Sequence, residues 1–193
     1  MKIAIIGAGN MGSGLARALA AAGYDVAIGN HEPSKAAALA TEIGGSARGG
    51  GIAAAVKLAD TVILAVPYGV MAGAIKEAGD LSGKILVDIS NPITADFKGL
   101  VIGHTTSAAE EIQALAPSAR VVKAFNTIFA GLLPAEARMG KTLQVFLASN
   151  DAAAKEAVAK LAKSIDFEPV DAGPLSNAPV SYTHLTLPTN REV

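Results

Sequence analysis

The sequence predicts a doubly wound α/β fold, in which helices cover both faces of a mostly parallel sheet. Short apolar segments alternate with helical segments along the chain, several of them are continuously apolar, and the first one runs directly into a glycine-rich turn. Strands covered on both faces are expected to be continuously apolar, and regular alternation of strands with helices is typical of parallel sheets. These three observations together favour a mostly parallel, doubly wound sheet.

The expected elements follow in chain order. Each expected strand is a short apolar run, and these runs lie at Lys2–Ile6, Asp25–Ile28, Thr61–Val66, Ile85–Ile89, Arg120–Ala124, Thr142–Ala148 and Phe167–Val170. Each expected helix lies between or after these runs, at Met11–Ala22, Pro33–Ile43, Ile52–Leu58, Val70–Ala78, Ser107–Ala116 and Ala152–Ser164. Ser107 and Glu110 have the spacing of a capping box, which gives the serine a structural role at a helix start. The glycines at positions 44–45 and 49–51 predict a flexible loop.

The glycine-rich turn has GxGxxG spacing, from Gly7 through Gly9 to Gly12. Gly7 permits a tight turn, Gly9 leaves room for a diphosphate against the backbone, and Gly12 lets the helix pack closely on the first strand. The N–H groups that begin the helix would then face the phosphates. Because the motif lies between a strand and a helix, we expect an NAD(P)-binding Rossmann fold. The alternative is a glycine-rich turn that binds no ligand.

Composition places the chain among globular proteins with one domain. Of its 193 residues, 51% are hydrophobic and 17% are charged, which suits a sizeable core. The formal net charge of -1 provides no overall basic field, so we expect no nucleic-acid partner. The absence of cysteine excludes disulfides, thiolate catalysis and cysteine-ligated metals. The uncharged stretch Thr61–Ile75 is too short to span a bilayer, and we expect a cytoplasmic protein without membrane contact.

The end of the second expected strand is where this fold reads the adenosine ribose. NAD-dependent enzymes place an acid there, whereas this chain has Asn30 and His31, with Lys35 one turn into the next helix. An amide donor and two basic groups suit a 2′-phosphate, so we expect NADP in preference to NAD. Glu32 has the wrong sign for that ligand, and His31 is also compatible with a solvated loop position.

The ends of three further strands meet at the same edge of the sheet. Ala65, Val66 and Pro67 lie at the end of the third expected strand, with Pro67 shaping the turn. Asn91, Asn126 and Thr127 follow the next two strands, where they either bind a nicotinamide amide or a second substrate, or simply form turns. The sequence has no metal-binding cluster, nucleophile elbow or paired-carboxylate signature. We therefore expect no catalytic side chain: the bound cofactors carry the chemistry, and no metal is involved.

The last residues are interpreted differently. The segment from Val180 to Thr189 resembles the translation of a transposase-based sequencing adapter from a shotgun read. We therefore expect one natural domain at residues 1–178, truncated at its C-terminus, and a non-native tail at 179–193. On this hypothesis His184 belongs to no site, while His104 is expected on an exposed loop.

From Met1 to about Ala178, the chain resembles the NADPH-dependent deazaflavin (coenzyme F-420) reductases. The motifs that carry this resemblance are 7–12, 29–31 with Lys35, 65–67, 84–92, 121–127 and 171–177. Two of them, Ser90–Pro92 and Val121–Asn126, are equally similar to the NADPH-binding domain of the membrane-bound STEAP ferric reductases. The resemblance therefore indicates the fold and NADP more firmly than the acceptor.

The resemblance implies hydride transfer between NADP(H) and a deazaflavin (coenzyme F-420) or flavin-like acceptor, by a homodimer when the protein has its full length. It assigns the diphosphate to the glycine loop with Asn10 and Met11, and the 2′-phosphate to Asn30, His31 and Lys35, where the family usually has arginine in place of His31. It assigns the nicotinamide side to Pro67 and the acceptor pocket to Ser176 and Asn177.

Two other functions remain open from the sequence. One is a non-catalytic NADP sensor. The other is a β-hydroxyacid dehydrogenase or pyrroline-carboxylate reductase, whose families share a similar glycine-rich opening. Those families continue into a long helical domain, whereas this chain continues with strand-like runs at Thr142–Ala148 and Phe167–Val170.

Overall fold

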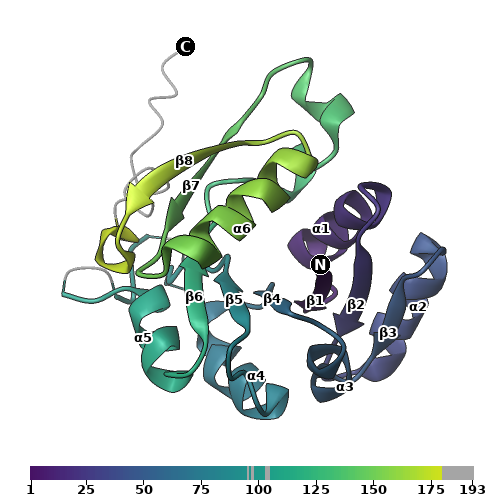
Figure 1. Ribbon diagram of the computed structural model, residues 1–193, viewed down its shortest axis with the longest axis horizontal. Coiled ribbons are helices and arrows are strands. Elements are labelled where there is room, and N and C mark those ends of the chain that lie inside the picture. The colour runs from purple at the N-terminus through teal and green to yellow at the C-terminus, as the bar shows by residue number, and fades with distance from the viewer. Residues whose placement is uncertain (95, 97, 103–104, 180–193) are drawn as a thin grey trace.

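An eight-stranded sheet forms the centre of the molecule, in the order β3-β2-β1-β4-β5-β6-β7-β8 (Figure 1). The computed structural model describes residues 1–94, 96, 98–102 and 105–179. The strands are β1 (Lys2–Ile6), β2 (Asp25–Gly29), β3 (Arg48–Gly50), β4 (Thr61–Leu64), β5 (Ile85–Asp88), β6 (Arg120–Lys123), β7 (Gln144–Ala148) and β8 (Glu168–Gly173). Only the β6–β7 pairing is antiparallel. The expected doubly wound Rossmann fold is confirmed. The strand order runs outward in both directions from the β1–β4 pair, so the switch point of the topology lies between these two parallel strands.

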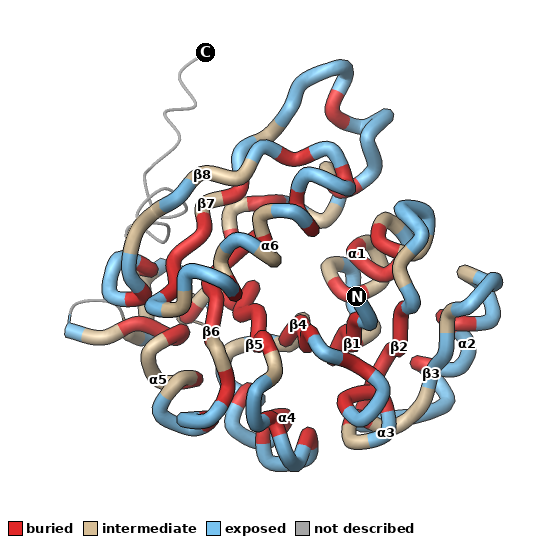
Figure 2. Tube along the Cα trace, viewed as in Figure 1, coloured by how far each residue is buried: buried red, intermediate tan, exposed pale blue. Residues whose placement is uncertain are grey.

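Helices cover both faces of this sheet. The helices are α1 (Asn10–Ala21), α2 (Pro33–Ile43), α3 (Ile52–Lys57), α4 (Met71–Ala78), α5 (Ala108–Leu115) and α6 (Ala152–Ser164). Buried residues of α1, α2 and α6 form one apolar core with the sheet, and those of α3, α4 and α5 form a second core on the opposite face. Figure 2 shows that burial is concentrated along the strands and on the helix surfaces that face them. This arrangement explains why the strand runs are continuously apolar.

Side-chain caps begin two of the helices where the sequence places them. The Ser107 hydroxyl accepts from the N–H of Glu110 at 3.1 Å, and the Glu110 carboxylate accepts from the N–H of Ser107 at 2.9 Å. The predicted capping box of α5 is therefore confirmed. Asp151 starts α6 in a similar way, because its carboxylate accepts from the N–H of Ala154 at 2.8 Å.

Four short 3-10 helices connect the main elements. They are η1 (Tyr68–Val70), η2 (Ala130–Leu132), η3 (Ala135–Arg138) and η4 (Leu175–Asn177). Gly14 of α1 faces Leu133, and a Cβ at Gly14 would lie 2.5 Å from the Leu133 Cδ1. The segment between β6 and β7 therefore packs against α1, on the side of the sheet where the glycine loop begins.

One prediction from the glycines is wrong. The expected flexible loop contains strand β3, which pairs with β2 from Arg48 to Gly50. Glycine lowers strand propensity, so the sequence gives no strand signal there. Gly49 is required for packing, because a Cβ at this position would lie 2.1 Å from the carbonyl oxygen of Ala36 in α2. The helix can therefore approach the edge of the sheet more closely than a side chain would allow.

The last residues of five parallel strands, β1, β2, β4, β5 and β6, are paired in one row across the sheet. Ile6 is paired with Gly29 and Leu64, Leu64 with Asp88, and Asp88 with Lys123. Parallel strands place their carboxyl ends at one edge, so the segments that follow these residues all begin at the same level. Strands β4, β5 and β6 end one or two residues earlier than the apolar runs predict, because the chain turns away after this row.

Some expectations concern residues that are not described. His104 and the segment 180–193, which includes His184, lie outside the described residues. Within the described part of the chain, none of the helices has the length and apolar character needed to cross a bilayer.

Candidate functional site

The glycine loop after β1 is tightly closed against β4. Gly7 has φ +113°, and a Cβ there would lie 2.3 Å from the carbonyl oxygen of Ala65. A Cβ at Gly12 would lie 2.0 Å from the carbonyl oxygen of Gly7. Both contacts are far shorter than a side chain tolerates, so these two positions require glycine. The first turn of α1 is thereby held directly above the end of β1.

Open space surrounds the middle glycine of the same loop. A Cβ at Gly9 would meet no described atom within 4 Å, although the backbone there has ordinary dihedral angles, with φ -77°. Gly9 is the N-cap of α1, and the first turn of this helix has no acidic side chain. The N–H groups that begin a helix lack intrahelical partners and favour anions. The loop therefore fits a diphosphate, with Asn10 and Met11 supplying backbone donors beside Gly9.

The turn after β2 brings the predicted basic residues together around a carboxylate. Asn30 is nearly buried, and its side-chain oxygen accepts from the N–H of Glu32 at 2.9 Å. The Glu32 carboxylate lies 2.7 Å from the Nζ of Lys35 and 3.3 Å from the Nε2 of His31. The hydrogen bond from Lys35 is the largest cause that lowers the pKa of Glu32. An anion that enters this turn would meet the same two basic groups in competition with Glu32.

The segment after β4 is held by backbone and side-chain hydrogen bonds. The N–H of Ala65 donates to the carbonyl of Ile6 at 2.8 Å, and Val66 packs on the apolar core. Pro67 is exposed and is the N-cap of η1. The hydroxyl of Tyr68 then donates to the Glu111 carboxylate of α5. The turn at 65–67 is therefore fixed at the edge of the sheet, next to the glycine loop.

Two asparagines join the segments that follow β5 and β6. The Nδ2 of Asn91 donates to the carbonyl of Asn126 at 2.8 Å, and the Nδ2 of Asn126 lies 3.1 Å from the Oδ1 of Asn91. Phe125 precedes the second asparagine with φ 57°, a left-handed conformation that is uncommon for a large residue. Its ring is buried edge-on against Phe167, with centroids 6.0 Å apart. This turn places Asn126 beside Asn91 at the carboxyl edge of the sheet.

The comparisons with known proteins agree with this geometry. The family described as NADP oxidoreductase, coenzyme F420-dependent, matches residues 2–92. The F420-dependent NADP reductase of Methanothermobacter marburgensis is 33% identical over an alignment of 198 residues. The alignment covers 93% of this chain and 87% of that protein. This chain belongs to the F420-dependent NADP oxidoreductase family. It is thus a member of a family of NADP-dependent oxidoreductases, as the resemblance implies.

A solved structure and a second relative extend the comparison. The crystal structure of a candidate F420-dependent NADP reductase from Arthrobacter sp. FB24 has a TM-score of 0.87, with 34% identity over 96% of this chain and 90% of that one. Metalloreductase STEAP3 of Rattus norvegicus is 33% identical over 177 residues. That match covers 92% of this chain but 35% of the metalloreductase. The chain therefore spans about a third of that relative and most of the archaeal one.

One buried ion pair at the same edge is not among the site residues predicted from the sequence. The Nζ of Lys123 lies 2.8 Å from the Oδ2 of Asp88 and also donates to the carbonyl of Ser90. Both side chains are at most 2% exposed. Burial lowers the pKa of Lys123, and the adjacent carboxylate partly offsets this change. A lysine and an aspartate at the ends of two neighbouring strands are the signal that could have revealed the pair.

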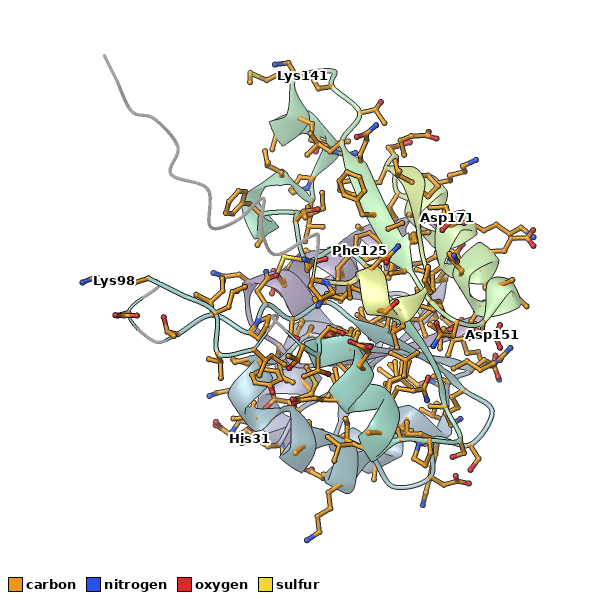
Figure 3. The ribbon with its side chains drawn as sticks, turned by 90° about the vertical axis from the view of Figure 1, so that its left-hand side faces the viewer. His31, Lys98, Phe125, Lys141, Asp151 and Asp171 are labelled. Atoms are coloured by element: carbon orange, nitrogen blue, oxygen red, sulfur yellow. The ribbon has the colours of Figure 1, made fainter. Side chains whose placement is uncertain are left out.

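Ser176 and Asn177 lie apart from the segments described above. They belong to η4, which follows β8 and packs through Leu175 on the core under α5. The Nδ2 of Asn177 donates to the carbonyl of Ala172 at 2.7 Å, so this amide turns back onto its own strand. Figure 3 shows His31 and Lys98, which follow β2 and β5, on one side of the molecule, with Asp151 and Asp171 on the other. The structure therefore joins Asn91 with Asn126, and places η4, which carries Ser176 and Asn177, against α5, β6 and β7.

The described residues bring together no group of three or more histidine or carboxylate side chains that could hold a metal ion. The carboxyl edge offers backbone N–H groups at the start of α1, the amides of two asparagines and the basic groups of the β2 turn. Such groups bind and orient an anionic, amide-bearing ligand. This donor set fits a dinucleotide.

Proposed function

We propose that the chain binds NADP(H) along the carboxyl edge of the sheet and transfers hydride between this coenzyme and a deazaflavin (coenzyme F-420) or flavin-like acceptor. The observation that carries the proposal is the glycine loop. Gly7 and Gly12 close it against the backbone, while the space at Gly9 is open beside the start of α1. Membership of the F420-dependent NADP oxidoreductase family supports the choice of coenzyme.

Each segment of the edge has a role in this proposal. The diphosphate lies on Gly9, Asn10 and Met11, where backbone donors and the helix dipole favour negative charge. The 2′-phosphate lies at the turn after β2, where His31 and Lys35 exchange their contact with Glu32 for the phosphate. Asn30 holds the shape of that turn through its hydrogen bond to the Glu32 N–H. The coenzyme then crosses the sheet where the strand order reverses.

The nicotinamide end lies between Ala65–Pro67 and the paired asparagines. Bound NADPH supplies the hydride, and the protein contributes orientation and exclusion of water. The amides of Asn91 and Asn126 neither gain nor lose protons near neutral pH, so they bind and orient without acid–base chemistry. Thr127 follows on the same buried turn and adds a hydroxyl. Ser176 and Asn177 help to close the acceptor pocket in this proposal.

The acceptor is a ring that takes hydride face to face with the nicotinamide. The archaeal relatives are named as F420-dependent NADP reductases, which favours a deazaflavin. A flavin-like ring is the second candidate. Both acceptors need the same NADP(H) site, so they are distinguished by turnover and not by coenzyme binding.

The test is a titration followed by an acceptor assay. NADPH and NADH are titrated against the purified chain, and NADPH oxidation is then followed by its near-ultraviolet absorbance with deazaflavin, FMN, FAD or ferric chelate. We expect tighter binding of NADPH than of NADH, and turnover with a deazaflavin or a flavin. Binding without turnover with any acceptor would instead indicate a sensor. Failure to bind either nucleotide would overturn the proposal.

A further inference from the structure

The Lys123–Asp88 pair is unusual because its neighbours in the sheet are apolar. Lys123 and Asp88 are paired in register at the ends of β6 and β5, and the preceding residues of both strands belong to the apolar cores. Desolvation makes a buried ion pair a weak source of stability, and apolar residues of similar volume often replace one without loss. Stability of the sheet alone is therefore a poor explanation for charges at these two positions.

The pair holds the main chain on both sides of Ser90. The Oδ1 of Asp88 accepts from the N–H of Ser90 at 2.8 Å, and the Nζ of Lys123 donates to the carbonyl of the same residue. The hydroxyl of Ser90 is buried and has no hydrogen-bond partner among the described residues. The ion pair therefore fixes the backbone of residue 90, and with it the peptide that leads into Asn91.

The main chain of the same two residues also leads to the second asparagine. The N–H of Ala124 donates to the carbonyl of Asp88 at 3.1 Å, directly before the left-handed turn at Phe125. Asn126 then meets Asn91 through the two amide contacts of 2.8 and 3.1 Å. The two segments that carry the asparagines thus start from one buried anchor.

We propose that Lys123 and Asp88 are positioning residues, which hold Asn91 and Asn126 in the arrangement that receives the nicotinamide end of the coenzyme. This inference rests on the proposed function, because it assumes that the asparagines face NADP(H). The pair touches neither the coenzyme nor the acceptor. Its effect is confined to the nicotinamide half, since the turn after β2 is fixed by separate contacts of Asn30 and Glu32.

Another lysine–aspartate pair provides a matched control. The Nζ of Lys155 lies 2.6 Å from the Oδ1 of Asp171 and donates to the carbonyl of Gly173 at 2.9 Å. It has the same chemistry as the buried pair, with one carboxylate and one backbone carbonyl, but it joins α6 to β8. Ser90→Ala is a second control, because it removes a hydroxyl without a partner and keeps the backbone bonds.

The experiment compares two ligands that differ only in the nicotinamide. Affinities for NADPH and for 2′-phospho-ADP-ribose, with melting temperatures, are measured for Lys123→Met, Asp88→Asn, the double variant, Lys155→Met and Ser90→Ala. We expect both single variants and the double variant to bind NADPH at least fivefold more weakly, with affinity for 2′-phospho-ADP-ribose within twofold of the wild type. The double variant should melt above the single variants, because it leaves no unpaired buried charge. Both controls should bind both ligands as the wild type does.

The double variant keeps the test available if a single variant does not fold. A double variant that binds NADPH as tightly as the wild type would overturn the inference. Equal weakening of both ligands would also overturn it, because the pair would then support the whole fold. A wild-type protein that binds neither ligand would overturn the proposed function itself.

Discussion

At the scale of single residues, the turn after β2 is where we propose that NADPH is distinguished from NADH. Lys35 is exposed, and its Nζ lies 2.7 Å from the Glu32 carboxylate. A 2′-phosphate offers more charge and more acceptor oxygens than that carboxylate. The contact seen here therefore holds the lysine close to the position that the proposed phosphate would take.

Replacement of Lys35 by methionine should lower affinity for NADPH selectively. Hydrogen bonds to charged groups contribute about 1.5–3 kcal/mol, so loss of one at this exposed turn should weaken NADPH about tenfold or more. Affinity for NADH, which lacks the phosphate, should stay within about twofold. Fluorescence titration of both nucleotides measures the two constants. Lys160→Met is the matched control, because Lys160 makes a similar exposed contact of 2.8 Å with Glu156 on α6. Equal losses for NADPH and NADH would contradict the assignment of the phosphate site.

The sequence reveals individual residues of the edge but not all of their partners. Asn91 and Asn126 could be predicted because each follows an apolar strand, and parallel strands end at one edge. Lys123 and Asp88 carry only the signal of opposite charges at two strand ends, and their direct pairing depends on the strand register in the folded sheet. The contact of Glu32 with both His31 and Lys35 also depends on side-chain rotamers in the folded turn.

At the scale of elements, different glycines of the strand–turn–helix unit β1–α1 serve close packing and the proposed ligand binding. Gly12→Ala places a Cβ 2.0 Å from the Gly7 carbonyl oxygen, which forces α1 away from β1. Such overpacking costs about 1–3 kcal/mol, so the midpoint of thermal unfolding should fall clearly. Gly9→Ala meets no described atom and should cost less than about 1 kcal/mol through the weaker N-cap.

Gly12→Ala should mainly lower stability, whereas Gly9→Ala should mainly lower the affinity for NADPH. Gly9→Ala should keep most of the stability and still bind NADPH much more weakly, because its methyl group enters the space proposed for the diphosphate. Calorimetry and titration on the same samples give both quantities. If Gly9→Ala binds NADPH as tightly as the wild type, the diphosphate does not lie on this loop.

The contact between η1 and α5 makes stability depend on pH in the alkaline range. Burial is the largest cause that raises the pKa of Tyr68 from 10.0 to about 12, followed by its hydrogen bond to Glu111. The folded state therefore keeps this proton when the unfolded chain has lost it. The resulting stabilisation is complete below pH 10.0 and is lost as the pH rises to about 12. Denaturant unfolding of Tyr68→Phe should show a shallower decline in this interval than the wild type. An identical decline in the two proteins would show that Tyr68 does not carry the effect.

Strand β3 shows why one element could not be predicted from the sequence. Its residues Arg48–Gly50 include two glycines, which lower strand propensity. The strand exists because Gly49 lets α2 pack against its backbone, which is a tertiary requirement. The other elements carry local signals, such as the apolar run of β4 or the Ser107 cap of α5, and these place them within a few residues.

At the scale of the whole molecule, two cores on opposite faces of one sheet join the N-terminal and C-terminal parts. The core under α1 and α2 continues into β7 and α6, and the core under α3 and α4 continues through α5 to η4. The doubly wound order could be predicted from the alternation of strands and helices. The antiparallel pairing of β7 with β6 could not be predicted, because it rests on one residue pair, Lys123 with Ala148.

Coenzyme binding should therefore stabilise the molecule as a whole. A ligand that binds only the folded state at about 100 times its dissociation constant adds about 2.7 kcal/mol to the free energy of unfolding. For a chain of 193 residues, each kcal/mol raises the melting temperature by about 2–4 °C, so saturating NADPH should raise it by about 5–10 °C. NADH at the same concentration should raise it less, and Lys35→Met should reduce the NADPH shift towards the NADH value. Differential scanning calorimetry at several nucleotide concentrations measures this dependence. A melting temperature that does not change with NADPH concentration would contradict binding to the folded state, because mass action allows no ligand to bind one state without displacing the equilibrium towards it.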